Sequence, residues 1–251
     1  MPVDVCEFMV RNPYPGRVIG FRSARPGHLE GLMMLTGRSP ASKARALDPI
    51  RNGNVVLQAR ATDDGPHDEL RHYPAVIADN HGIVIANGDH SVPLHAALAD
   101  ARLDSQIAAT RYEPDPPINT SRISVVLELR TQRVIASVNA AATTDRDAAA
   151  VLARFDAHAG DLNDWIMLST YQSDGTIIEP NYQFTRVAFS TGDPLAEAWE
   201  AADPRYRVAA AAITFENGTA VAETVFHTGA ADRADHPVRY RTEESSSVVA
   251  V

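Results

Sequence analysis

The feature of the sequence that most constrains its fold is a succession of short apolar runs of strand length. The runs lie at residues 18–21, 32–36, 55–59, 73–78, 82–86, 123–129, 134–138, 165–171, 182–188, 208–215 and 221–226. The runs at 73–78 and 82–86 flank a short turn at Asp79-Asn80-His81, which is typical of an antiparallel hairpin. Stretches with helical spacing are few and do not alternate regularly with these runs. This order favours an α+β layered fold over a doubly wound sheet.

Three stretches predict helices, and each has a residue suited to cap its amino end. The helices are expected at 91–103, at 145–159 and from 194 onward. The capping residues would be Ser91, Thr144 and Asp193. No internal repeat or clear linker interrupts the chain, so we expect one domain over residues 1–229, followed by a polar tail at 230–251.

Composition excludes several classes of protein. The formal net charge of -9 argues against a nucleic-acid partner, because an acidic surface repels phosphate backbones. The single cysteine, Cys6, allows no internal disulfide. No apolar run approaches the roughly 20 residues needed to cross a bilayer, and the start of the chain has no basic, apolar leader pattern. We therefore expect a cytoplasmic protein without a membrane partner.

The loop that follows the apolar run 32–36 has the chemistry of an anion site. Glycine at Gly37 lets the backbone approach a ligand closely, and Arg38 can grip a phosphate with two parallel donors. Ser39 adds a hydroxyl, and Lys43 is the only lysine in the chain. The other reading is a polar loop with solvated charges, and the loop alone does not decide between the two.

Other polar clusters stand next to predicted strands. Asn87, Gly88 and Asp89 precede a predicted helix, where a plain turn and a site for an anion or carbonyl oxygen are both open readings. Glu113 stands in a loop stiffened by prolines, which holds a carboxylate at little entropic cost. Asn119-Thr120-Ser121-Arg122 leads into the run at 123–129, and Tyr171 ends another run.

Common nucleotide and metal motifs are missing from the sequence. There is no Gly-x-Gly-x-x-Gly motif and no Walker loop. The histidines, including His90 and His95, lack metal-ligand spacing and are expected to lie on the surface or cap helices. We therefore predict neither a metal nor a cofactor.

Taken together, seven motifs in one order resemble the archaeal-type IMP cyclohydrolase family and its bacterial relatives. They are Asn12-Pro13-Tyr14-Pro15-Gly16-Arg17, Gly37-Arg38-Ser39, Tyr73, Asn87-Gly88-Asp89, Tyr112-Glu113-Pro114-Asp115, Asn119-Thr120-x-Arg122-Ile123 and Ser169-Thr170-Tyr171. The resemblance covers residues 7–215. It implies a four-layer α-β-β-α sandwich like that of the N-terminal-nucleophile hydrolases, without self-processing, and a homo-oligomer.

The activity implied by the resemblance is ring closure of FAICAR to IMP with loss of water, in purine nucleotide biosynthesis. The attack is intramolecular, so positioning supplies much of the rate and the reaction needs no cofactor. By resemblance, Arg38, Tyr73 and Glu113 would be catalytic. The residues that would hold the phosphate, ribose and base are Arg17, Ser39, Lys43, Asn87, Gly88, Asp89, Asn119, Thr120, Arg122 and Tyr171.

The sequence departs from the family pattern at three places. The archaeal pattern has an arginine at the position of Lys43, an asparagine at that of Pro74 and an arginine near Ile77. Two of these changes fall on the strand that carries Tyr73, so the base end of the site is altered more than the phosphate end. Two alternatives therefore stay open: a related cyclase or amide hydrolase acting on another nucleotide-like carboxamide, and a non-catalytic nucleotide-binding homologue.

Overall fold

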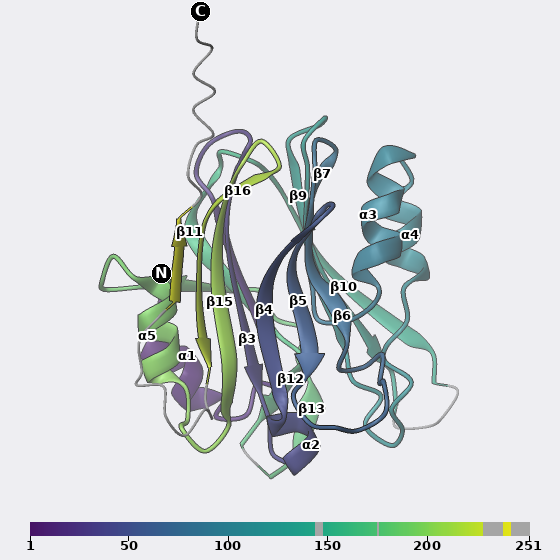
Figure 1. Cartoon of the computed structure of the whole chain (residues 1–251), viewed down its shortest axis with the longest axis vertical. Coiled ribbons are helices and arrows are strands. Elements are labelled where there is room, and N and C mark those ends of the chain that lie inside the picture. Colours follow the sequence, from purple (N-terminus) through teal and green to yellow (C-terminus); the bar gives the residue numbers. More distant parts are fainter. Residues whose placement is uncertain (144–147, 175, 228–237, 242–251) are drawn as a thin grey trace, which may run out of the picture.

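Two large β-sheets facing one another form the body of the protein. The structure is a computed structural model, and it describes residues 1–251 except 144–147, 175, 228–237 and 242–251. One sheet has eight strands in the order β1-β14-β11-β2-β3-β15-β16-β17, and the other has seven in the order β10-β9-β8-β7-β6-β5-β4. Figure 1 shows the two sheets side by side with helices on either flank. The α+β class predicted from the sequence is confirmed.

The strands of the eight-stranded sheet pair antiparallel, except for the parallel pair β1–β14. Their bounds are β1 Val3–Asp4, β2 Arg17–Ser23, β3 His28–Thr36, β11 Leu162–Ser169, β14 Thr185–Ala188, β15 Arg207–Glu216, β16 Thr219–His227 and β17 Val238–Arg241. The expected tail at 230–251 is described only where β17 pairs with β16, and its other residues lie outside the described part of the chain.

The seven-stranded sheet is antiparallel throughout. Its strands are β4 Arg45–Asn52, β5 Val55–Ala61, β6 Tyr73–Ala78, β7 Gly82–Ala86, β8 Arg122–Glu128, β9 Arg133–Ala141 and β10 Ala150–His158. A small third sheet pairs β12 Tyr171–Ser173 with β13 Ile178–Pro180. The predicted hairpins β6–β7 and β8–β9 are confirmed, because in each case consecutive apolar runs pair across a short turn.

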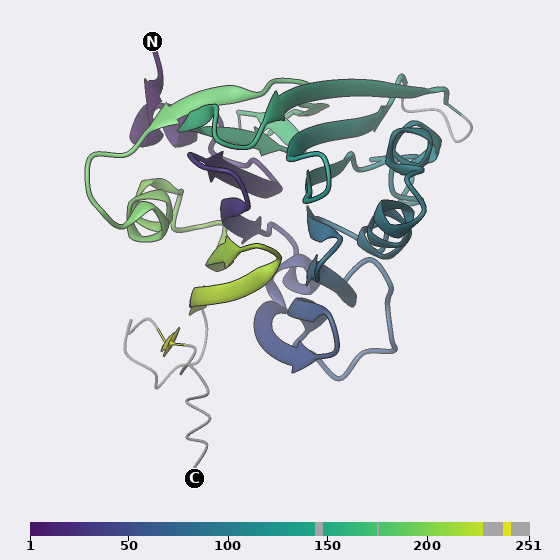
Figure 2. The ribbon, with the colours of Figure 1, turned by 90° about the horizontal axis from the view of Figure 1, so that it is seen from above.

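Helices cover the outer face of each sheet (Figure 2). Helices α1 Val5–Arg11 and α5 Pro194–Ala201 pack on the eight-stranded sheet, where Phe8 and Trp199 join one buried cluster. Helices α3 Ser91–Ala99 and α4 Leu103–Ala109 pack on the seven-stranded sheet through residues such as Leu94 and Ile107. The short helix α2 Pro40–Lys43 follows β3 at one end of the molecule.

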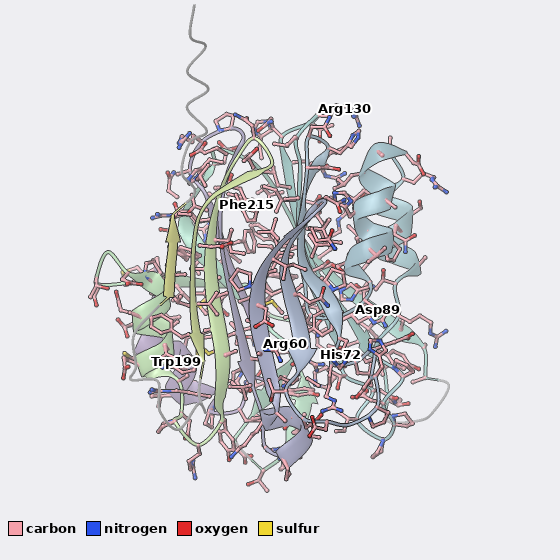
Figure 3. The ribbon with its side chains drawn as sticks, viewed as in Figure 1. Arg60, His72, Asp89, Arg130, Trp199 and Phe215 are labelled. Atoms are coloured by element: carbon pink, nitrogen blue, oxygen red, sulfur yellow. The ribbon has the colours of Figure 1, made fainter. Side chains whose placement is uncertain are left out.

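The largest hydrophobic cluster lies between the two sheets. It joins side chains such as Phe21 and Phe215 of one sheet to Leu57 and Ile85 of the other. Figure 3 shows Phe215 among the strands and Trp199 on the side of α5, so the chain has separate apolar layers inside and outside the eight-stranded sheet. These layers hold the strand ends that form the site in place.

The helix predicted at 145–159 is wrong over its described part, because Ala150–His158 form strand β10, which pairs antiparallel with β9. Its predicted cap, Thr144, lies outside the described residues. Alternate side chains, including Phe155, pack against the core between the sheets, while Arg154 faces outward to Asp104. This period of two is present in the sequence, but the alanines and arginines also favour a helix, and pairing with β9 overrides that weak preference.

The helix predicted at 91–103 is two helices. Helix α3 ends at Ala99, and Ala101 takes a positive φ of 54° before α4 begins. Ser91 is not the cap: the cap position belongs to His90, and the Ser91 hydroxyl donates to the carbonyl oxygen of Pro74 at 2.5 Å. The predicted cap of α5 is confirmed, since the Asp193 carboxylate accepts a hydrogen bond from the Ala196 N–H.

No helix in the described ranges of the chain is long and apolar enough to cross a membrane.

Candidate functional site

A cleft of about 410 Å³ opens at the end of the molecule that carries α2 and β12. It lies where the first residues of β2 and β4 meet the last residue of β3 and the loops at 62–72 and 110–121. Its lining residues are Tyr14, Gly16, Arg17, Thr36, Arg38, Ser39, Ala41, Ser42, Arg45, Asp68, Leu70, Arg71, Glu113, Asp115, Ile118, Thr120 and Tyr171. Six of the predicted site residues are therefore brought together: Arg17, Arg38, Ser39, Glu113, Thr120 and Tyr171.

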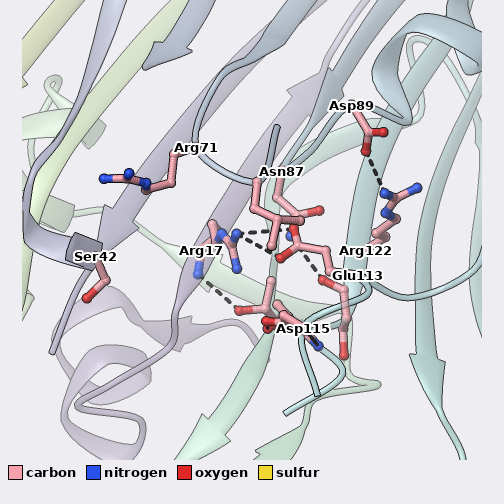
Figure 4. Close-up of polar contacts among 12 residues, drawn as sticks. Arg17, Ser42, Arg71, Asn87, Asp89, Glu113, Asp115 and Arg122 are labelled. Carbon is pink, nitrogen blue, oxygen red and sulfur yellow. Dashed lines mark hydrogen bonds and ion pairs between the residues drawn. The ribbon is translucent and has the colours of Figure 1, made fainter. Parts of the chain in front are cut away.

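A buried ion pair between Arg17 and Glu113 lies in the wall of this cleft. Nη2 of Arg17 donates to Oε1 and Oε2 of Glu113, at 3.1 and 3.0 Å. The side chains are only 9% and 2% exposed, respectively. Figure 4 shows the two side chains pointing at one another from β2 and from the loop before β8. Each charge of such a buried pair depends on its alignment with the other, because either partner alone would be a desolvated and uncompensated charge.

The carboxyl of Glu113 is poised to exchange a proton near neutral pH. Burial raises its pKa to about 7, and the negative charge of Asp115 acts in the same direction. The guanidinium groups of Arg17 and Arg122 oppose this rise. Arg17 itself keeps its charge: burial disfavours the guanidinium, but Glu113, Tyr73, Tyr171 and Asp115 together more than offset this, and the pKa of Arg17 is raised. A carboxyl balanced in this way suits acid–base chemistry.

Tyr73, the first residue of β6, lies behind the cleft wall. It is 1% exposed, and within the described part of the chain its hydroxyl has no hydrogen-bond partner. Burial raises its pKa, while the nearby charges of Arg17 and Arg45 lower it. The phenol therefore shares the electrostatic surroundings of the Arg17–Glu113 pair, although it does not line the cleft. A buried hydroxyl without a partner is unfavourable by about 1–3 kcal/mol.

The loop before β8 is fastened by a chain of short hydrogen bonds. The carboxylate of Asp115 accepts from the Thr120 N–H at 2.7 Å and from the Thr120 hydroxyl at 2.6 Å. The Thr120 oxygen is also 2.6 Å from the Tyr171 hydroxyl, so the phenol is the donor there. Burial raises the pKa of Tyr171 to about 12. Tyr171 also stacks on Tyr14, and the two rings form an aromatic wall.

The Gly37-Arg38-Ser39 loop borders the cleft as a rigid turn. A Cβ on Gly37 would lie 2.6 Å from the backbone carbon and oxygen of Ser42, so only glycine fits. Ser39 and Ser42 cap α2 reciprocally, each side chain accepting from the backbone N–H of the other. Arg38 lies over the ring of Tyr14, with 4.8 Å between Cζ and the ring centroid. Lys43 is exposed and is not part of the lining.

Two arginines that the sequence analysis missed line the cleft. Arg45 is buried, and it donates to the carbonyl oxygens of Ser42 and Thr36. Arg71 is held by the carboxylates of Asp63 and Asp68 at 2.7 and 3.0 Å. Arg45 follows Lys43 in the loop already singled out and could have been included, whereas nothing in the local sequence marks Arg71.

Besides Lys43, five predicted binding residues lie outside the cleft lining: Asn87, Gly88, Asp89, Asn119 and Arg122. Asn87 is fully buried, and its amide bonds the carbonyl of Ser121 and the N–H of Ile123. Asp89 and Arg122 form an ion pair of 2.5 Å (Figure 4). Asn119 is buried with a positive φ of 51°.

His90 differs from its expected surface or capping role. It occupies the cap position of α3 but is only 2% exposed, and its side chain makes no capping hydrogen bond. In the described ranges no group of three or more histidine, cysteine or acidic side chains could hold a metal ion.

The cleft thus combines a buried carboxyl with a pKa near 7, a set of arginines and an aromatic wall. A comparison with curated proteins finds no match. The model of the family described as IMP cyclohydrolase-like protein matches residues 14–219, a range that contains every residue of the cleft lining. The chain therefore belongs to the IMP cyclohydrolase-like family.

Proposed function

We propose that the protein closes the purine ring of FAICAR, giving IMP and water. The observation that carries the proposal is the buried Arg17–Glu113 pair, in which Glu113 has a pKa of about 7 and faces an arginine-rich cleft. Family membership supports the same chemistry. We also propose that the layering of helices and sheets is the four-layer sandwich of the N-terminal-nucleophile hydrolases.

Ring closure needs a proton acceptor and a way to stabilise the formyl oxygen. The carboxamide nitrogen attacks the formyl carbon, a C–N bond forms, and the formyl oxygen becomes a hydroxyl. Glu113 in its ionised form takes the proton from the attacking nitrogen and delivers it to the formyl oxygen, which gives the hydroxyl. The formamido N–H then gives up its proton by the same route as the C=N bond of the ring forms, the C–O bond breaks, and the hydroxyl leaves as water. Arg17 stays charged beside it and stabilises the developing negative charge. Holding both reacting groups of one substrate in place supplies much of the rate.

The substrate phosphate fits best among the other cations that line the cleft. Arg38, Arg45 and Arg71 all line it, in a protein whose net charge is -9. Arginine binds phosphate with a planar pair of donors, so a few guanidinium groups are sufficient. We assign the phosphate to these arginines and to Ser39 rather than to Lys43, which is exposed and is not part of the lining.

One observation favours the non-catalytic alternative. Tyr73 lies behind the cleft wall, so its hydroxyl reaches a substrate only if the wall moves. A protein that binds nucleotides without turning them over would not need such a movement.

The test incubates the purified protein with FAICAR and follows IMP formation by absorbance. We expect turnover, and we expect Glu113→Gln to lower it by about 100-fold, the usual size of a general acid–base contribution. Arg71→Ala should weaken IMP binding while Lys43→Ala leaves it unchanged, which makes the two variants a matched pair.

Tyr73→Phe separates the catalytic reading from the binding one. It removes only the buried hydroxyl, so a loss of turnover of at least tenfold assigns that hydroxyl to catalysis. Absence of turnover in the parent protein, combined with thermal stabilisation by IMP, would refute ring closure and support nucleotide binding alone.

A further inference from the structure

The protonation state and orientation of His90 are set by its surroundings. Its Nε2 lies 3.3 Å from the carbonyl oxygen of Ile123, which can only accept a hydrogen bond. Burial, followed by the charge of Arg122, lowers the pKa of His90 to about 3. The ring is therefore neutral, with its proton on Nε2 and a lone pair on Nδ1.

That lone pair faces the same small space as the carboxyl of Glu113. Nδ1 of His90 is fully buried and has no hydrogen-bond partner in the described part of the chain. A Cβ on Gly88 would lie 3.2 Å from this nitrogen and 3.4 Å from Oε1 of Glu113. Glycine at this position keeps the space between the two groups open, and any other residue would fill it.

The charged groups around Glu113 come from several elements. Arg17 on β2, Arg45 on β4 and Arg122 on β8 favour the carboxylate, whereas Asp115 in the same loop as Glu113 favours the protonated form. The phenols of Tyr73 on β6 and Tyr171 on β12 are also within electrostatic range of Glu113. Arg122 is itself paired with Asp89, which weakens its effect. A hydrogen-bond acceptor that faces the carboxyl stabilises its protonated form, because only that form has a hydrogen to donate.

We propose that His90 is a positioning residue for Glu113, accepting at Nδ1 a hydrogen bond from the protonated carboxyl, directly or through one water molecule beside Gly88. The bond directs the proton to Oε1, the oxygen that faces the gap. Oε2 then keeps its hydrogen bond from Arg17, while Oε1 gives up the one that it accepts from Arg17 in the structure. The inference rests on the proposed function only in giving this proton a role in ring closure; the contact itself is independent of any substrate.

The test measures the protonation of Glu113 directly in the full-length protein without substrate. Isotope-edited infrared spectroscopy follows the carbonyl band of the protonated carboxyl against pH, and Glu113→Gln supplies the baseline. His90→Gln keeps a donor for Ile123 but lacks the Nδ1 acceptor, and we expect it to lower the titration midpoint by about one pH unit, a tenfold change in proton affinity. His90→Asn, which places an amide oxygen near Nδ1, should restore most of the difference.

Two further variants make the result decisive. Gly88→Ala fills the gap while keeping the histidine in the chain and should lower the midpoint in the same direction. His81→Gln, in the exposed turn between β6 and β7, should leave it unchanged. If His90→Gln fails to fold, the titration midpoint of Gly88→Ala alone tests the inference.

An unchanged midpoint in folded His90→Gln or Gly88→Ala protein overturns the inference. The outcome for the proposed function is separate, because the titration is read whether or not FAICAR is turned over. In an active enzyme, the acid limb of the pH profile of kcat/KM should move with the infrared midpoint.

Discussion

Replacing Glu113 by glutamine should change how the stability of the protein depends on pH. Burial raises the folded-state pKa of Glu113 from an ordinary value of 4.5 to about 7. Between these two values the folded protein holds a proton that the unfolded chain has released. Its stability therefore falls as pH rises through this window, and the contribution is fully present only below about pH 4.5.

The size of the effect follows from the two pKa values. At about 1.36 kcal/mol for each pH unit, the difference corresponds to about 3 kcal/mol of unfolding free energy. Glutamine cannot ionise, so Glu113→Gln removes this loss. Relative to the parent, the variant should gain about 3 kcal/mol between pH 4 and pH 7.5. Any constant offset from the altered contact with Arg17 cancels in that comparison.

Urea unfolding at a series of pH values measures this difference, with the m value checked at each pH. Arg17→Met provides a second curve: without the guanidinium that opposes the rise, the decline should extend to higher pH. Glu179→Gln, at an exposed position of β13, serves as the control for removing a carboxylate. Parallel curves for the parent and Glu113→Gln across pH 4.5–7 would refute the reasoning.

Two further predictions concern stability away from the ion pair. Gly37→Ala places a Cβ 2.6 Å from the backbone of Ser42 and should destabilise the protein by about 1–3 kcal/mol. Gly192→Ala is the control and should be nearly neutral, because the space around Gly192 is open. Equal unfolding midpoints for the two variants would contradict this prediction. Asp104, 59% exposed, pairs with Arg133 and Arg154, whose hydrogen bonds lower its pKa to about 2. Its stabilisation should be present above about pH 4 and lost as pH falls toward 2. Asp104→Asn should therefore cost less than about 1 kcal/mol at pH 7 and less still in high salt, and a salt-independent loss in urea unfolding would be the contrary result.

Local patterns predicted most strands well, because alternating or continuous apolar residues bounded by turn residues leave few other backbone solutions. The β6–β7 and β8–β9 hairpins are examples. The failure at 150–158 has a clear cause: Ala and Arg favour helix weakly, and pairing with β9 outweighs that preference. The sequence analysis does not predict the helix Val5–Arg11, although the sequence offers a cap for it. The Asp4 side chain accepts a hydrogen bond from the Cys6 N–H at its start.

The chemistry of single residues locates part of the cleft. Arg38, Ser39 and Glu113 were singled out from their loops and do line one cleft. Asn87 holds the start of β8, and its contact with a ligand stays a prediction. An asparagine at a strand end offers the same donors and acceptors in both roles, so the sequence cannot separate them.

By itself, the sequence determined the α+β class, most strand positions and the glycine turn at Gly37, because these depend on residues close together in the chain. The tertiary structure alone decided that Arg17 pairs with Glu113, 96 residues away, and that Arg71 joins the cleft. It also decided that His90 is buried near this pair and that Tyr73 is buried behind the cleft wall. Burial and charge pairing are properties of the assembled sheets. They shift the pKa of Glu113 to about 7, and no local pattern contains that information.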